Sequence, residues 1–136
     1  MRKIFILFFI FIFSYSVYYF RFDLYSLLIE ISGKIEIENE LEKNIRPNTM
    51  LYIKVRNDKN IIFAIKEIIN PVFPVNFSIN RKNVLYPDIS SFNIKIETTI
   101  NSHGEVGKIK PGDIYSKPIE ANIFSRNIKI KIDRTR

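Results

Sequence analysis

The stretch Phe73-Pro74-Val75-Asn76-Phe77-Ser78-Ile79-Asn80 has an apolar residue at every second position from Phe73 to Ile79. Side chains along a β-strand point alternately to the two faces of a sheet, so this period of two predicts a strand that buries one face. The same alternation occurs in four other stretches, residues 35–37, 51–55, 94–96 and 128–132. Residues 61–69 are more continuously apolar, which is typical of a central strand.

Segments rich in Pro, Gly, Asn and Asp separate these stretches, among them Arg46-Pro47-Asn48 and Lys110-Pro111-Gly112-Asp113. Residues of these types favour turns. About seven short strands joined by turns, with no helix between them, predict an all-β domain over residues 32–136, built as an antiparallel β-sandwich. The sequence contains neither Cys nor Trp, so it lacks the disulfide and the core Trp of immunoglobulin domains, and the residues indicate the architecture alone.

An uncharged and strongly apolar segment, residues 4–20, precedes this domain and follows Arg2 and Lys3. A transmembrane helix needs about 17–25 apolar residues and the core of a signal peptide about 7–15, so the segment lies on the border between the two. Residues 1–21 are therefore predicted to form one N-terminal hydrophobic helix, either a signal anchor or a signal peptide, with residues 22–31 as a connecting segment. The basic residues at its start place the N-terminus in the cytoplasm, so the rest of the chain is expected to be exported.

Composition restricts the chemistry of the exported domain. With no Cys and a single His, the chain offers too few ligands for a zinc or copper site and no thiolate nucleophile. We therefore expect no metal, no cofactor and no enzymatic activity, and we interpret the chain as a binding module. His103 stands in a turn-rich segment near Glu105 and Asp113, where a solvated loop side chain is the favoured interpretation and a metal ligand or general base the alternative.

The chain carries 21 basic and 14 acidic side chains, for a net charge of +7. The Lys and Arg residues alternate with apolar residues instead of clustering, which favours a solvated sheet face over nucleic-acid binding, with attraction to a membrane surface or an acidic partner as the alternative. Glu36 and Glu38 project from one face of the first predicted strand, and Lys129 and Lys131 from one face of the last. Because opposite charges on adjacent strands attract, we expect these two strands to be neighbours.

Asn70-Pro71-Val72-Phe73-Pro74 is the most distinctive short motif. Two prolines three residues apart hold the chain extended, and neither can donate a hydrogen bond to a central ladder. One interpretation is a bend between strands with Phe73 as a core side chain. The other is an exposed aromatic patch that binds a partner, which makes Pro71, Phe73 and Pro74 the candidate partner-binding residues.

An ordered series of short motifs also resembles a known family. It comprises Ser32-Gly33-Lys34-Ile35-Glu36-Ile37, Leu51-Tyr52-Ile53-Lys54-Val55-Arg56, Phe63-Ala64-Ile65-Lys66, residues 70–79 and Pro111-Gly112-Asp113-Ile114-Tyr115. Over residues 32–133 the chain is similar to the C-terminal immunoglobulin-like periplasmic domain of the tetratricopeptide-containing cytochrome c-type biogenesis protein. That family holds unfolded apocytochrome c for haem attachment, at the periplasmic face of the inner membrane.

The resemblance implies an immunoglobulin-like β-sandwich and an accessory or chaperone-like role in periplasmic c-type cytochrome maturation. The implied partner is apocytochrome c or a component of the haem-lyase complex, with no nucleic acid involved. The chain would then be a single-pass inner-membrane protein with a periplasmic domain, or a periplasmic protein if the signal is cleaved. The alternative is a structural envelope module that binds another membrane protein complex.

Overall fold

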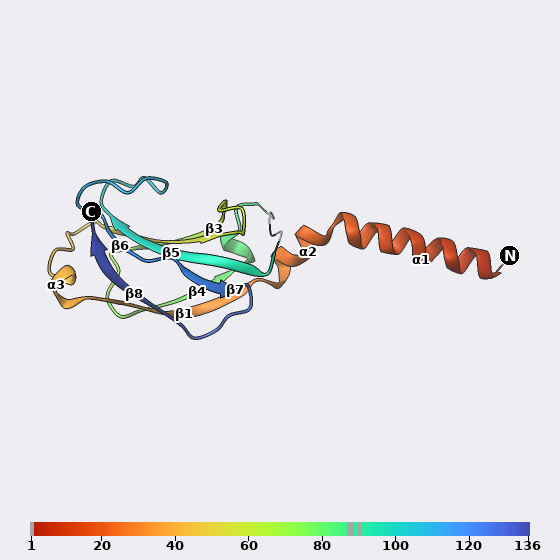
Figure 1. Cartoon of the computed structure of the whole chain (residues 1–136), viewed down its shortest axis with the longest axis horizontal. Coiled ribbons are helices and arrows are strands. Elements are labelled where there is room, and N and C mark those ends of the chain that lie inside the picture. Colours follow the sequence, from red (N-terminus) through yellow and green to blue (C-terminus); the bar gives the residue numbers. More distant parts are fainter. Residues whose placement is uncertain (1, 87–88, 90) are drawn as a thin grey trace.

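A computed structural model describes residues 2–86, 89 and 91–136 of the chain (Figure 1). Two helices lead from the N-terminus into a β-rich body, and the first helix extends away from that body. The predicted all-β domain with one apolar N-terminal helix is therefore confirmed at this level.

The first helix, α1 (Arg2–Tyr19), buries none of its side chains and is long and apolar enough to cross a membrane. Its 18 residues span about 27 Å at 1.5 Å per residue, close to the roughly 30 Å of a bilayer's hydrocarbon core. A short second helix, α2 (Arg21–Leu28), follows directly and lies where the sequence predicts a connecting segment. The chain thus enters the β-rich body without an extended linker.

Eight strands among the described residues form a single sheet. They are β1 (Glu30–Ile37), β2 (Met50–Arg56), β3 (Ile62–Ile69), β4 (Val75–Asn80), β5 (Asn93–Asn101), β6 (Ile114–Ser116), β7 (Ile119–Asn122) and β8 (Ile128–Thr135). Two short helical turns, α3 (Asn39–Glu42) and η1 (Arg81–Asn83), lie between strands. The strand order is β3-β2-β5-β6-β8-β1-β4, with β7 beside β5, and the sheet curls until it is nearly barrel-like.

The first and last strands, β1 and β8, are neighbours, as the charge pattern predicts. Glu36 faces Lys131 in the register, and the Lys131 ammonium donates to Glu38 at 2.9 Å. The two strands run parallel, however, so the sheet is mixed and the expectation of an entirely antiparallel arrangement is wrong. Alternation of apolar residues has the same period in parallel and antiparallel strands, and it therefore carries no information about direction.

Strand β3 lies at an edge of the sheet, where residues 61–69 were predicted to form a central strand. Its apolar character has another cause, because the segment after η1 covers the β3 edge. Ala64 forms an isolated bridge with Val84, and the Leu85 N–H donates to the Phe63 carbonyl oxygen at 2.8 Å. Phe63 and Ala64 are fully buried beneath this cover.

The core lies inside the curled sheet. The predicted alternation of buried and exposed residues is confirmed along β4 but not along β2, where all five residues from Leu51 to Val55 are buried. Along β4, Val75, Phe77 and Ile79 are buried while the residues between them are exposed. Other strands contribute Ile31, Ile35, Leu51, Ile53, Val55, Ile94, Ile96, Ile130 and Ile132 to the same core. Each such side chain stabilises the fold by about 1.5–3 kcal/mol through removal of apolar surface from water.

Candidate functional site

The end of the β-rich body that faces away from α1 gathers the residues singled out from the sequence (Figure 1). We call it the distal end, and it consists of α3, residues 70–74, residues 102–113 and the end of β8. The Asn70 N–H donates to the Thr49 carbonyl oxygen at 2.9 Å, which holds the β3–β4 connection against the start of β2.

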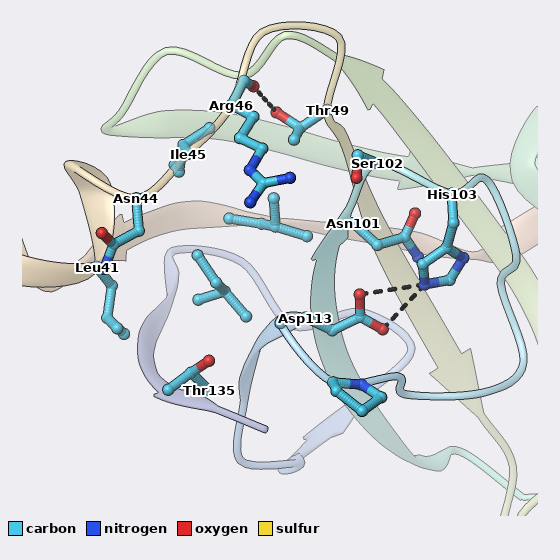
Figure 2. Close-up of a pocket in the computed structure, with 14 residues that line it drawn as sticks. Leu41, Asn44, Ile45, Arg46, Thr49, Asn101, Ser102, His103, Asp113 and Thr135 are labelled. Atoms are coloured by element: carbon cyan, nitrogen blue, oxygen red, sulfur yellow. Dashed lines mark hydrogen bonds and ion pairs between the residues drawn. The ribbon is translucent and has the colours of Figure 1, made fainter.

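A pocket of about 470 Å³ opens at the distal end (Figure 2). Its apolar lining comes from Leu41, Ile45, Ile100 and Ile114, and Arg46 points its guanidinium group into the space. The Thr49 hydroxyl donates to the Arg46 carbonyl oxygen at 2.9 Å and fixes the backbone there. Most of the lining surface is nevertheless polar, because Asn44, Thr49, Asn101, Ser102, Asp113 and Thr135 also line the pocket.

One wall of the pocket is a contact between His103 and Asp113 (Figure 2). The His103 Nε2 atom lies 3.1 Å from both carboxylate oxygens of Asp113, and Asp113 is 3% exposed. The Lys110 N–H also donates to Asp113, at 2.7 Å. His103 thus connects the two ends of the loop of residues 102–113. It is an exposed loop residue, as predicted, and it also contacts Asp113.

The other ring nitrogen of His103 is engaged as well. The Glu105 N–H donates to His103 Nδ1 at 3.1 Å, so Nδ1 acts as the acceptor and the ring proton is assigned to Nε2, facing Asp113. A general base needs a free ring lone pair within reach of its substrate, and this arrangement provides none. Within the part of the chain that the structure describes, no group of three or more His, Asp and Glu side chains could hold a metal ion.

The predicted partner-binding residues lie together in the β3–β4 connection. Phe73 is half-buried and packs against the core, Pro71 is half-buried and Pro74 is exposed. Sequence reasoning missed Val72, which is 83% exposed, and the exposed Ile69 at the end of β3. Because the Phe73 side chain turns toward the core, the side chain of the neighbouring Val72 points outward. The sequence signal for an exposed Val72 was its position between Pro71 and Pro74.

The two edge strands β3 and β4 face each other across a line that we call the seam. No strand among the described residues pairs with the seam side of either one. The end of the seam nearer α2 is covered by the bridge between Ala64 and Val84. Farther toward the distal end, the Lys66 ammonium reaches across the seam and donates to the Ser78 carbonyl oxygen at 2.9 Å. An inward-pointing lysine at a sheet edge hinders uncontrolled strand pairing. The remaining edge of β3, residues 65–69, leads into residues 70–74 at the distal end.

A second charged cluster lies on β2 and β5. Glu97 accepts hydrogen bonds from the Arg56 guanidinium at 2.8 and 3.1 Å, and the Lys54 ammonium lies 3.0 Å from the same oxygen. Burial raises the pKa of Glu97, but the hydrogen bonds and charges of Arg56 and Lys54 outweigh burial, and the net pKa is lowered. Because structural ion clusters also shift pKa values, this cluster is not by itself a sign of catalysis.

Comparison of the chain with protein-family models, with curated proteins and with solved structures finds no match. The resemblance of residues 32–133 to the cytochrome c-type biogenesis family therefore stays a prediction from the sequence.

Proposed function

We propose that the chain is a membrane-anchored binding module that holds an extended polypeptide at its distal end. The observation that carries this proposal is the position of α1 and the distal end at opposite ends of the molecule (Figure 1). An anchor at one end leaves the loops at the other end accessible to a soluble partner.

Strand addition is the binding mode that the exposed edge favours. An extended peptide can pair with residues 65–69 of β3 through main-chain hydrogen bonds, which provide affinity without a specific sequence. The exposed side chains of Ile69 and Val72 would contact apolar residues of the peptide, beside Pro71, Phe73 and Pro74. The free edge of β3 is its seam side, so the peptide would enter the seam from the distal end, and the contact of Lys66 with Ser78 limits how far it extends toward α2.

The narrower form of the proposal is a role in c-type cytochrome maturation at the periplasmic face of the inner membrane, with apocytochrome c or a haem-lyase component as the partner. Support comes from the family resemblance over residues 32–133 and from the apolar helix α1. In this form the single curled sheet would correspond to an immunoglobulin-like sandwich, with β3, β2 and β5 forming one layer, β8, β1 and β4 the other, and β6 joining them.

The hydrogen bonds of the His103 ring favour a binding role of the chain over an enzymatic one. Both of its ring nitrogens are occupied by Asp113 and by the Glu105 N–H. One short edge and a small apolar patch form an interface below about 1,200 Å², which is typical of weak and transient complexes. Attachment to a membrane that also carries the partner raises its effective concentration and compensates in part.

The test is a titration of the full chain, in detergent micelles, with apocytochrome peptides that carry the Cys-x-x-Cys-His haem-attachment sequence. Isolated periplasmic segments of haem lyase form a second series. Val72→Asp should weaken binding because it places a charge in the apolar contact, whereas Leu85→Asp serves as a matched control at an exposed apolar position near α2.

Absence of binding in both series at high micromolar concentration, together with normal c-type cytochromes after deletion of the gene, would overturn the maturation role. The structural envelope module would then be the better interpretation. Equal weakening by both variants would instead remove the distal end as the binding surface.

A further inference from the structure

We propose that the end of the β-rich body next to α2 rests on an anionic membrane surface. We call this surface the proximal face and define it by Leu27, Leu28, Leu85, Tyr86, Phe92 and Phe124, all of which are exposed. The inference rests on the membrane anchoring that forms part of the proposed function. It adds a lipid contact of the folded domain itself, beyond the spanning helix.

The helix α2 presents an apolar side to the outside. Leu24, Leu27 and Leu28 are three and four residues apart, so they share one helical face, and each is exposed. Tyr25 packs against the core from the same helix, and Ser26 is buried. The outward row of leucines is therefore an exposed apolar surface that can enter the boundary between headgroups and acyl chains of a bilayer.

An aromatic cluster extends this apolar side onto the β-rich body. The Tyr25 ring lies 5.2 Å from the Phe92 ring in an edge-to-face contact, and the Phe92 and Phe124 rings are 5.8 Å apart. The Ile123 N–H donates to the Phe92 carbonyl oxygen at 3.0 Å, which fixes the two segments relative to each other. Phe92 and Phe124 are nevertheless 44% and 47% exposed, so a prearranged aromatic surface faces outward.

Basic residues stand beside these apolar side chains. The turn η1 contacts α2 and carries Arg81 and Lys82, both exposed, and the exposed Leu85 and Tyr86 follow within four residues. Basic residues that flank apolar ones favour the surface of a bilayer with anionic lipids, because the charges remain at the headgroups while the apolar groups enter. The basic residues and the apolar side chains of the proximal face therefore both favour an anionic bilayer as the partner.

The position of the anchor brings this face to the bilayer. Tyr15, Tyr18 and Tyr19 end α1, and the Arg21 guanidinium lies 4.2 Å from the centre of the Tyr18 ring. Tyrosines and a basic residue mark the level of the headgroups at the end of a spanning helix. Because α2 begins at Arg21 and spans about 12 Å, the proximal face lies within reach of the headgroup region (Figure 1).

The absence of Trp from the sequence allows a direct test with single-tryptophan variants. Phe124→Trp and Leu85→Trp place a reporter on the proximal face, and Val72→Trp places the control at the distal end. The full chain is reconstituted into vesicles of phosphatidylcholine and phosphatidylglycerol in equal parts, with or without brominated acyl chains. We expect a blue shift and strong quenching by brominated lipid for both face variants, and neither for Val72→Trp.

The outcomes separate this inference from the proposed anchoring. A chain that floats with the vesicles while its face tryptophans are not quenched would retain the anchor and overturn the contact. A chain that does not float would overturn both. A blue shift of the face tryptophans without quenching by brominated lipid would mean that a second copy of the chain covers the proximal face. Quenching of Val72→Trp as strong as that of the face variants would show unspecific lipid contact. Either result would overturn the inference. Weaker quenching with phosphatidylcholine alone is expected if Arg81 and Lys82 contribute.

Discussion

The ammonium group of Lys54 lies 3.0 Å from Oε1 of Glu97, and the Lys54 side chain is 3% exposed. The two residues are directly opposed in the β2–β5 register, and Arg56 donates to the same carboxylate oxygen from the next outward position of β2. A charge removed from water is costly unless it is paired, so Glu97 is the group that makes burial of Lys54 tolerable.

Replacement of Glu97 should therefore strongly destabilise the fold. Glu97→Ala leaves the Lys54 ammonium buried without its partner, and removal of one member of a buried pair costs about 3–5 kcal/mol in the free energy of unfolding. Lys95→Ala, an exposed position two residues away on β5, is the matched control and should change little. Urea unfolding of the full chain in micelles, followed by circular dichroism, measures both. If Glu97→Ala lowers the free energy of unfolding only slightly, the Lys54 ammonium must be able to reach water in the variant.

The same carboxylate predicts a pH dependence. Burial raises the pKa of Glu97 but its hydrogen bonds to Arg56 and Lys54 lower it further, so the folded pKa lies below the ordinary value of 4.5. The unfolded chain then binds a proton at a higher pH than the folded protein does. The stabilisation from Glu97 is complete above the ordinary value and is lost as the pH falls through the folded pKa.

Comparison with Glu97→Gln isolates this contribution. The difference in unfolding free energy between wild type and Glu97→Gln should be constant near neutral pH and should shrink as the pH falls below the ordinary pKa of a glutamate. A difference that stays the same over the whole range would show that Glu97 does not titrate below its ordinary pKa.

Gly33 fixes the approach of β1 to β8. A Cβ atom at this position would collide with the main-chain carbonyl oxygen of Ile128, the residue that faces Gly33 in the parallel pair. Gly33→Ala should therefore displace the two strands and cost about 1–3 kcal/mol, as overpacking does elsewhere. Gly107→Ala, where a Cβ meets no atom within 4 Å, is the control. Equal melting temperatures of the two variants would contradict the close parallel pairing.

The sequence predicts the faces of the strands better than their partners. Burial of alternate residues is a local property, so Phe77 and Ile130 are correctly assigned to the core from their own neighbours. The opposed charges of Glu36 and Lys131 also identify β1 and β8 as neighbours. The edge position of β3 was not predictable, because the segment around Val84 that covers Phe63 lies about twenty residues later in the chain.

The candidate site shows the same limit. Asp113 is one of the two acids noted near His103, yet no pattern indicates that the loop folds back to bring them within 3.1 Å. The buried pair of Lys54 and Glu97 belongs to strands that are distant in sequence, and each residue by itself resembles a solvated position of an alternating strand. Such contacts depend on which strands become neighbours, and they can therefore be identified only from the tertiary structure.

Phe77 and Asn76 provide a test of the alternation itself on the edge strand β4. Phe77 is 4% exposed and faces the core, whereas Asn76 is exposed on the opposite face. Phe77→Ala should cost about 3–5 kcal/mol, since a large cavity remains in a core that relaxes only in part. Native domains are stable by about 5–15 kcal/mol, so this variant should be partly unfolded at ordinary temperature while Asn76→Ala stays folded.

Thermal unfolding of the two variants, monitored by circular dichroism on the full chain, measures the difference. Both substitutions leave the β1–β4 ladder intact, because each changes a side chain and not a main-chain donor or acceptor. The comparison therefore isolates side-chain burial from strand pairing. Melting temperatures that fall by the same amount would mean that β4 has slipped by one residue against β1, since such a slip exchanges the two faces.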